Sequence, residues 1–178
     1  TDQLLPPAFT STPTINNTLP TVGTTISVNA FTFSGNPTPT VAYQWSLNSS
    51  PVVGATTASY TTSATGPISV GITLTNSQGT TFTTATANAG IAPNFLVPPS
   101  ASATGVTVGT TVTVNNVATS GTAPITTSYM WKLDGSIISG ATSQSYATST
   151  TGDLVSTVTA TNAYGTTASD GVSFGTVV

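Results

Sequence analysis

Apolar and polar residues alternate along much of this chain with a period of two, the pattern of strands that bury one face. The clearest runs that share one phase are Ile26 and Val28, then Val41, Tyr43, Trp45 and Leu47, then Ile68, Val70, Ile72 and Leu74. Such runs recur every ~8–12 residues, the spacing of strands in sandwiches and barrels. Strong helix formers are scarce and Thr, Val, Ser, Gly and Pro dominate, so the sequence predicts an all-β protein.

The alternating pattern occurs twice. A shift of 86 residues aligns 7–92 with 93–178 without a gap, and 33 of the aligned pairs are identical. The segment YQWSLNSSPVVGATTASY at 43–60 returns as YMWKLDGSIISGATSQSY at 129–146, and TVGTT at 21–25 returns at 107–111. A period of 86 is too long for a solenoid repeat and suits a small domain. We therefore expect an N-terminal lead at 1–6 and two domains, at 7–92 and 93–178, joined by a short proline-containing connection near 90–99.

The second copy repeats the core positions with one interruption. The matching residues are Val112 and Val114, then Tyr129, Trp131 and Leu133, then Leu154, Val158 and Ala160. Ser156 interrupts the last run, so that strand is expected to pack less fully or to be shifted in phase. Asp134-Gly135 predicts a two-residue hairpin, since both residues tolerate positive φ. Asn48-Ser49 is a weaker form of the same turn.

Aromatic residues at these positions could suggest a binding site, but their alternating spacing favours the core. The predicted core residues are Tyr43, Trp45 and Leu47 in the first copy and Tyr129, Trp131 and Leu133 in the second. Tyr60 and Tyr146 are expected to pack their rings inward and to leave their hydroxyls at the edge of the core.

Charged residues are only 3% of the chain, against roughly 25% in ordinary soluble domains. They are Lys132 and four acids: Asp2, Asp134, Asp153 and Asp170. One lysine cannot neutralise a run of phosphates, so nucleic acid is not an expected partner, and neither is an anionic membrane surface. No apolar run has the ~18 residues of a membrane span, and no secretory signal pattern is present. The chain has no cysteine, so its cores must hold by packing alone.

The side chains of common catalytic and metal sites are largely missing. There is no His to act as a base or metal ligand. Asp134 and Asp153 lie in one copy and could be considered as a carboxylate pair, but their counterparts in the first copy are Asn48 and Pro67. Calcium normally requires more clustered carboxylates than this chain offers. The sequence therefore predicts no enzyme activity, no cofactor and no bound metal.

The order Tyr-x-Trp, hairpin turn, Gly-Ala-Thr, Ser-Tyr, Gly, alternating strand, Thr-Asn-x-x-Gly-Thr resembles the immunoglobulin-like domains of bacteria and phages. It reads YQW…GATTASY…G…TLTNSQGT in the first copy and YMW…GATSQSY…G…TATNAYGT in the second. The resemblance covers both copies and implies two tandem Greek-key β-sandwiches of about seven strands each. Such domains serve as spacers, adhesive modules and decorations of phage heads, tails and fibres.

Two functions follow as expectations. The first is a non-enzymatic structural or decorating protein of an extracellular assembly, above all a phage virion, whose partners are other structural subunits or further copies of itself. The second is an adhesive module of a bacterial surface protein that binds cell-surface glycan. Residues that differ between the copies, Tyr164, Lys132 and Asp134, are the candidate surface contacts. Both functions place the protein in a virion or at a cell surface.

Overall fold

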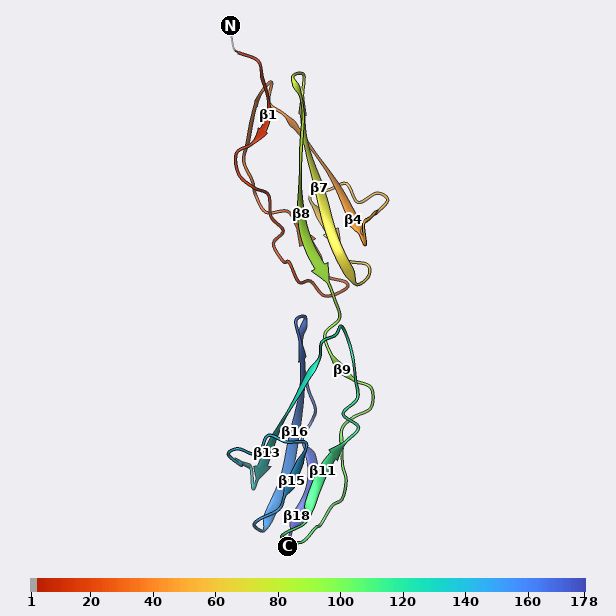
Figure 1. Cartoon of the computed structure of the whole chain (residues 1–178), viewed down its shortest axis with the longest axis vertical. Coiled ribbons are helices and arrows are strands. Elements are labelled where there is room, and N and C mark those ends of the chain that lie inside the picture. The colour runs from red at the N-terminus through yellow and green to blue at the C-terminus, as the bar shows by residue number, and fades with distance from the viewer. Residues whose placement is uncertain (1–2) are drawn as a thin grey trace. The chain divides into compact units, whose positions relative to one another are not determined.

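The computed structural model describes residues 3–178 and shows strands joined by turns and loops (Figure 1). Within that range there is no helix, and hence none long and apolar enough to cross a membrane. The chain divides into two compact units, one ending at Ile91 and the other spanning Ala92–Val178. Ala92, expected in the first domain, belongs to the second unit because it lies against Gly121 and Gly165, where an added Cβ would come within 3.0 Å of it.

The first strand begins inside the segment expected as an N-terminal lead at 1–6. The first strand already begins at Leu5, and the Leu5 carbonyl accepts a hydrogen bond of 2.9 Å from the Asn76 amide. Residues 5 and 6 are therefore part of the first sandwich, since strand pairing extends to its first residues. Residues 1 and 2 of that lead, including Asp2, lie outside the described part of the chain.

The first unit is built from eight strand segments. In chain order they are β1 (Leu5–Phe9), β2 (Thr25–Ser27), β3 (Phe33–Asn36), β4 (Thr40–Leu47), β5 (Ser50–Pro51), β6 (Ser59–Thr61), β7 (Gly66–Asn76) and β8 (Gly79–Ala89). One layer pairs β1 with β3 and β2 with β6, and the other has the order β5-β4-β7-β8. Neighbours that are not consecutive, such as β2–β6 and β4–β7, are the crossed connections of a Greek key.

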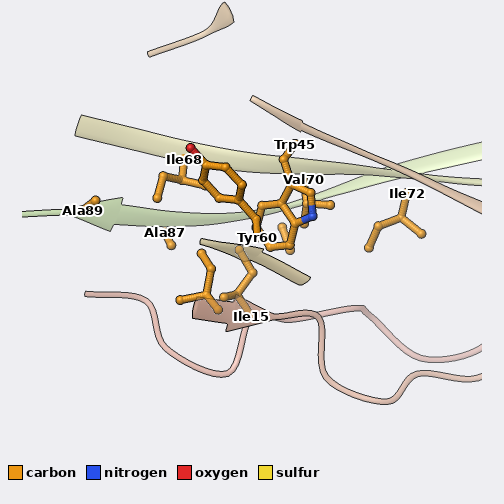
Figure 2. Packing of buried hydrophobic residues seen from close by; sticks show 10 residues of the cluster. Ile15, Trp45, Tyr60, Ile68, Val70, Ile72, Ala87 and Ala89 are labelled. Atoms are coloured by element: carbon orange, nitrogen blue, oxygen red, sulfur yellow. The ribbon is translucent and has the colours of Figure 1, made fainter. Parts of the chain in front are cut away.

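The core of the first unit lies between these two layers. Trp45 and Ile26 are fully buried, and the Trp45 and Tyr60 rings stack with centroids 5.5 Å apart (Figure 2). The Tyr60 hydroxyl lies 2.8 Å from the Ser63 hydroxyl, so its polar end stays at the rim of the core. Ile68, Val70, Ile72 and Leu74 of β7 are all buried, while Tyr43 and Leu47 pack against the core half-buried. Full burial of one aliphatic side chain contributes about 1.5–3 kcal/mol, so β7 alone is a large part of the stability.

The second unit has the same plan in ten segments. They are β9 (Asn94–Phe95), β10 (Ser100–Ala101), β11 (Thr111–Asn115), β12 (Thr119–Ser120), β13 (Thr126–Leu133), β14 (Ser136–Ile137), β15 (Ser145–Ala147), β16 (Gly152–Asn162), β17 (Gly165–Ala168) and β18 (Val172–Val177). Joining the segments that continue one path (β2 with β3, β9 with β10, β11 with β12, β17 with β18) leaves seven strands in each unit. Trp131 is fully buried, with Tyr129 and Leu133 packed against the core.

Both predicted hairpin turns are present. Asp134 and Gly135 have φ of 48° and 79°, and Asn48 and Ser49 have 51° and 65°. Each pair joins two strands whose closing residues are opposite one another, Leu133 with Ser136 and Leu47 with Ser50. The two turns therefore have the positive φ at both positions that a type I′ hairpin requires.

The last strand differs between the two units, which corrects one expectation about Ser156. β16 keeps its phase, because Leu154, Ser156 and Val158 are all buried. The shift lies in the neighbouring strand, β17–β18. Its pairing runs from Thr159–Ala168 through Ser156–Val172 to Leu154–Gly175. Between each of these pairs and the next, β17–β18 contains one residue more than β16. A one-residue bulge turns every later side chain to the other face of the sheet.

The first of these bulges brings a large side chain into the second core. Phe174 is fully buried and its ring centroid lies 5.1 Å from that of Trp131, whereas the aligned residue of the first unit, Asn88, is exposed. β8 instead buries the small side chains of Ala85, Ala87 and Ala89. Phe174 therefore packs against Trp131, which lies opposite Ser156, the residue that stands where the first unit has Val70.

Candidate interaction surface

The two acids considered for chemistry, Asp134 and Asp153, lie together but are used to hold a turn. The Asp134 N–H donates to the Asp153 carbonyl at 2.9 Å, and the Asp153 N–H donates to Asp134 Oδ1 at 2.8 Å. The Thr176 hydroxyl donates to Asp153 Oδ1 at 2.6 Å. In the first unit the Asn48 N–H makes the same bond to the Pro67 carbonyl at 2.8 Å. Because the turn forms equally well without carboxylates, this arrangement is explained by the fold.

The three predicted contact residues do not form one site. Lys132 is half-buried on β13, opposite Ile137 on one side and Val155 on the other, and makes no ion pair within residues 3–178. Tyr164 is half-buried in the turn between β16 and β17, at the other end of that sheet. Val155 and Asn162 are seven residues apart along β16, about 24 Å at a strand rise of about 3.4 Å. Tyr164 therefore lies far from Lys132 and Asp134.

A shallow hollow of about 270 Å³ opens beside the bulge of the second unit. It is lined by Asn94, Phe95, Pro98, Pro99, Ser169, Asp170 and Gly171. The residues of the bulge form one wall, and Asp170 is the single ionisable side chain in it. Its polar side chains are Asn94, Ser169 and Asp170, and no second charged group joins Asp170 in the lining.

The most unusual exposed side chain is Phe82 of β8, which the sequence reasoning above did not single out. Its ring is 62% exposed on the outer face of the β5-β4-β7-β8 sheet, the face turned away from the core. It lies across Gly71 of β7, since a Cβ added to Gly71 would come within 2.8 Å of Phe82 Cε2. Its surroundings on this face are hydroxyl and amide side chains, among them Gln44, Thr73 and Thr84.

The side of β8 from Thr80 to Thr86 that faces away from β7, here termed the β8 edge, has no strand paired to it within residues 3–178, although β1 of the other layer lies close to β8. β8 ends its sheet, and the Asn88 N–H points outward to the Thr18 carbonyl at 2.9 Å. Backbone groups of the same parity in an antiparallel strand point the same way. Those of Thr80, Phe82, Thr84 and Thr86 thus face away from β7, and within residues 3–178 none of them has a backbone partner on that side.

The corresponding edge of the second unit is interrupted. Ser169 closes the ladder at the bulge, since its N–H donates to the Val158 carbonyl at 2.8 Å and its Oγ accepts from the Val158 N–H at 3.0 Å. The exposed charge of Asp170 follows directly. Beyond it, the Phe174 carbonyl accepts a bond from the Gly105 N–H at 3.0 Å, so a neighbouring segment covers that part of the strand. Of these two corresponding edges, the one in the first unit is the longer and the more regular in the part of the chain that the structure describes.

No protein-family model matches the sequence, and no curated protein sequence matches it. Among solved structures the chain is similar to extracellular domains 3–5 of Drosophila OTK (TM-score 0.62, 19% identity, 99% of this chain and 62% of that one). It is also similar to immunoglobulin domains 1–4 of Sidekick-1 (0.60, 15%, 100% and 50%) and to the titin I-band fragment I67–I69 (0.55, 15%, 98% and 66%). The chain thus spans between half and two thirds of the length of these structures.

These similarities confirm the predicted fold class: each unit is an immunoglobulin-like β-sandwich, and the two follow one another in tandem. Sequence identities below 20% show the fold alone. A more specific function depends on the surface of the two units.

Proposed function

We propose that this chain is a non-enzymatic structural module of an extracellular assembly, specifically a decorating protein of a phage virion head, tail or fibre. The observation that carries the proposal is the charge-free surface of the first unit, with its open edge and exposed aromatic ring. Residues 3–91 contain no Asp, Glu, Lys, Arg or His. Such a surface recognises neighbours through backbone pairing and shape, as structural subunits do. The sequence resemblance to phage and bacterial immunoglobulin-like domains supports the virion.

The absence of a catalytic role is part of the same proposal. Asp134 and Asp153 already have hydrogen-bond partners that hold a turn. In residues 3–178 no three His, Cys, Asp or Glu side chains cluster as metal ligands would. The extracellular domains among the similar structures fit a location outside the cell.

Purified particles test the proposal. Mass spectrometry of virions from the source should find the chain at a fixed ratio to a main capsid or tail protein. Particles washed in high salt should keep it, because no charged surface of the first unit holds it there. Recovery of the chain only from the particle-free supernatant would refute the virion assignment.

A second function, adhesion to a neutral glycan, is favoured by Phe82. An exposed aromatic ring among hydroxyl and amide groups, with no charged side chain in residues 3–91, offers a stacking platform with hydrogen-bonding neighbours. A glycan array would show binding that Phe82→Ala abolishes and that Tyr164→Ala leaves intact. An array without hits would refute glycan binding and leave the structural role as the remaining proposal.

A further inference from the structure

We propose that the β8 edge of the first unit pairs antiparallel with the β8 edge of a second copy of this chain, so that two β5-β4-β7-β8 sheets join into one. The inference rests on the proposed function only in that both require protein neighbours. It names the strand, the register and the partner, which the proposed function leaves open.

The β8 edge carries a row of backbone groups that are unpaired within residues 3–178. The N–H and C=O groups of Thr80, Phe82, Thr84 and Thr86 all point away from β7. An antiparallel copy centred on Thr83 would place Thr80 opposite Thr86 of the other copy, and Phe82 opposite its Thr84. Every one of these groups would then find a partner, because residues of this parity form the hydrogen-bonded pairs of the new ladder. Unpaired groups of this kind are what makes an edge strand a template.

β8 also lacks the features that keep edge strands from pairing with one another. Natural edges are guarded by lysines, prolines, bulges or short length. β8 is eleven residues long, regular in register, and contains neither a charged residue nor a proline. The equivalent strand of the second unit has two bulges and the exposed charge of Asp170. Both units have the same fold, so the fold itself does not require an unguarded edge.

The lack of charge on β8 favours a second copy of this chain as its pairing partner. A charged edge is repelled by the same edge of a second copy, but every Asp and Lys in residues 3–178 lies in the second unit. The proposed register puts Phe82 opposite a threonine, a favourable pairing of an aromatic with a β-branched residue. Hydroxyl pairs of the kind this register would create already join strands within the unit, as between Ser27 and Ser59 at 2.9 Å.

Sedimentation velocity of the full chain over a concentration series tests the pairing. The wild type should form a dimer that dissociates on dilution. Thr84→Pro should raise the dimer Kd by at least about tenfold, because two hydrogen bonds per dimer are lost and the proline ring blocks the approach of the second strand. The Thr84 N–H makes no bond inside the unit, so proline there leaves the β7 ladder intact. Thr84→Lys, which places like charges beside one another, is the second variant and should act in the same direction.

Ala168→Pro is the control in the second unit, since Ala168 also faces away from the neighbouring strand β16 and aligns with Phe82, two residues before Thr84. It should leave the dimer Kd within about twofold of wild type if the first unit carries the contact. Circular dichroism and the unfolding midpoint check that each variant folds. A monomeric wild type, or a dimer indifferent to both changes at Thr84, would overturn the inference.

The register is tested by single cysteines in a chain that has none. Residue 83 would face its own copy in a non-hydrogen-bonded pair, with Cα atoms about 4.5 Å apart, within the range a disulfide spans. Thr83→Cys should therefore cross-link in air-saturated buffer. Thr81→Cys should not, because residues 81 of the two copies would be about 14 Å apart along the strands. Equal cross-linking of both variants would refute this register.

The outcomes also separate this inference from the proposed function. A wild type that is monomeric yet present in particles keeps the structural role and refutes the edge pairing. A wild type that dimerises through Thr84 but is absent from particles keeps the edge pairing and refutes the virion role.

Discussion

At the scale of single residues, the two tryptophans show why the repeated segment could be interpreted from sequence. Each indole N–H donates to a carbonyl twelve residues later, Trp45 to Thr57 and Trp131 to Ser143, both at 2.8 Å. The indole and the Gly-Ala-Thr loop therefore have to recur together. A buried indole needs a partner for its N–H, so spacing and burial are set by one requirement. This part of the core was predictable because it depends on residues close in sequence.

Ser156 gives the first prediction, because its Oγ is buried and has no hydrogen-bond partner among residues 3–178. Ser156→Ala removes a desolvated hydroxyl and keeps nearly the same volume. We expect the second unit to gain about 1 kcal/mol in its free energy of unfolding, measured by urea denaturation followed by tryptophan fluorescence.

Val70→Ala at the matching position of the first unit is the control. There the alanine deletes methyl groups from a filled core and should cost about 2 kcal/mol. A loss of stability on Ser156→Ala would mean that the hydroxyl has a stabilising role that contradicts this account.

At the scale of elements, the strands that alternate strictly were predictable and the course of the last strand was not. Thr81 and Thr167 are the last identical pair of the two copies, and the remaining eleven pairs share no residue. The loss of identity signals a change there. It does not reveal the bulges, because these are set by pairing with β16. Phe174 was missed for that reason.

The register of β18 predicts opposite outcomes for two aligned positions. Phe174→Ala should destabilise the second unit by about 3–5 kcal/mol, because it empties the space beside Trp131. Asn88→Ala at the aligned exposed position should change stability by no more than about 0.5 kcal/mol. Chemical denaturation of both variants measures the difference. Equal effects would contradict the bulged register.

Lys132 gives a prediction for β13, since it is the only residue after which trypsin can cut. It lies within a strand that is paired on both sides, by β14 and β16. Cleavage requires the backbone to leave the sheet, so the folded chain should resist trypsin for hours while the urea-unfolded chain is cut at once. A time course on a denaturing gel measures this. Rapid cleavage of the folded chain into two fragments would contradict the strand assignment.

At the scale of the whole molecule, the distribution of charge distinguishes the two units more than their folds do. Every charged side chain of residues 3–178 belongs to the second unit, including the one at its interrupted edge. Composition alone predicted a charge-poor surface. It did not identify Phe82 or the β8 edge as candidate contacts, because an edge is open or covered according to which segments pair far away in the sequence. Tyr164 was chosen from a turn, without knowledge of that pairing.

The last prediction concerns how association responds to salt. Between about 0.1 M and about 1 M NaCl the Debye length falls from about 10 Å to about 3 Å. The added salt therefore weakens both the attraction between opposite charges and the repulsion between like charges. The β8 edge has no charge, so the wild-type dimer Kd from sedimentation should stay within about threefold across this range. Thr84→Lys provides the internal comparison, since its two added charges should repel less at high salt and its dimer should partly recover. A wild-type dimer that dissociates steeply with salt would place the contact on Lys132 and the acids of the second unit, and would exclude β8 as its source.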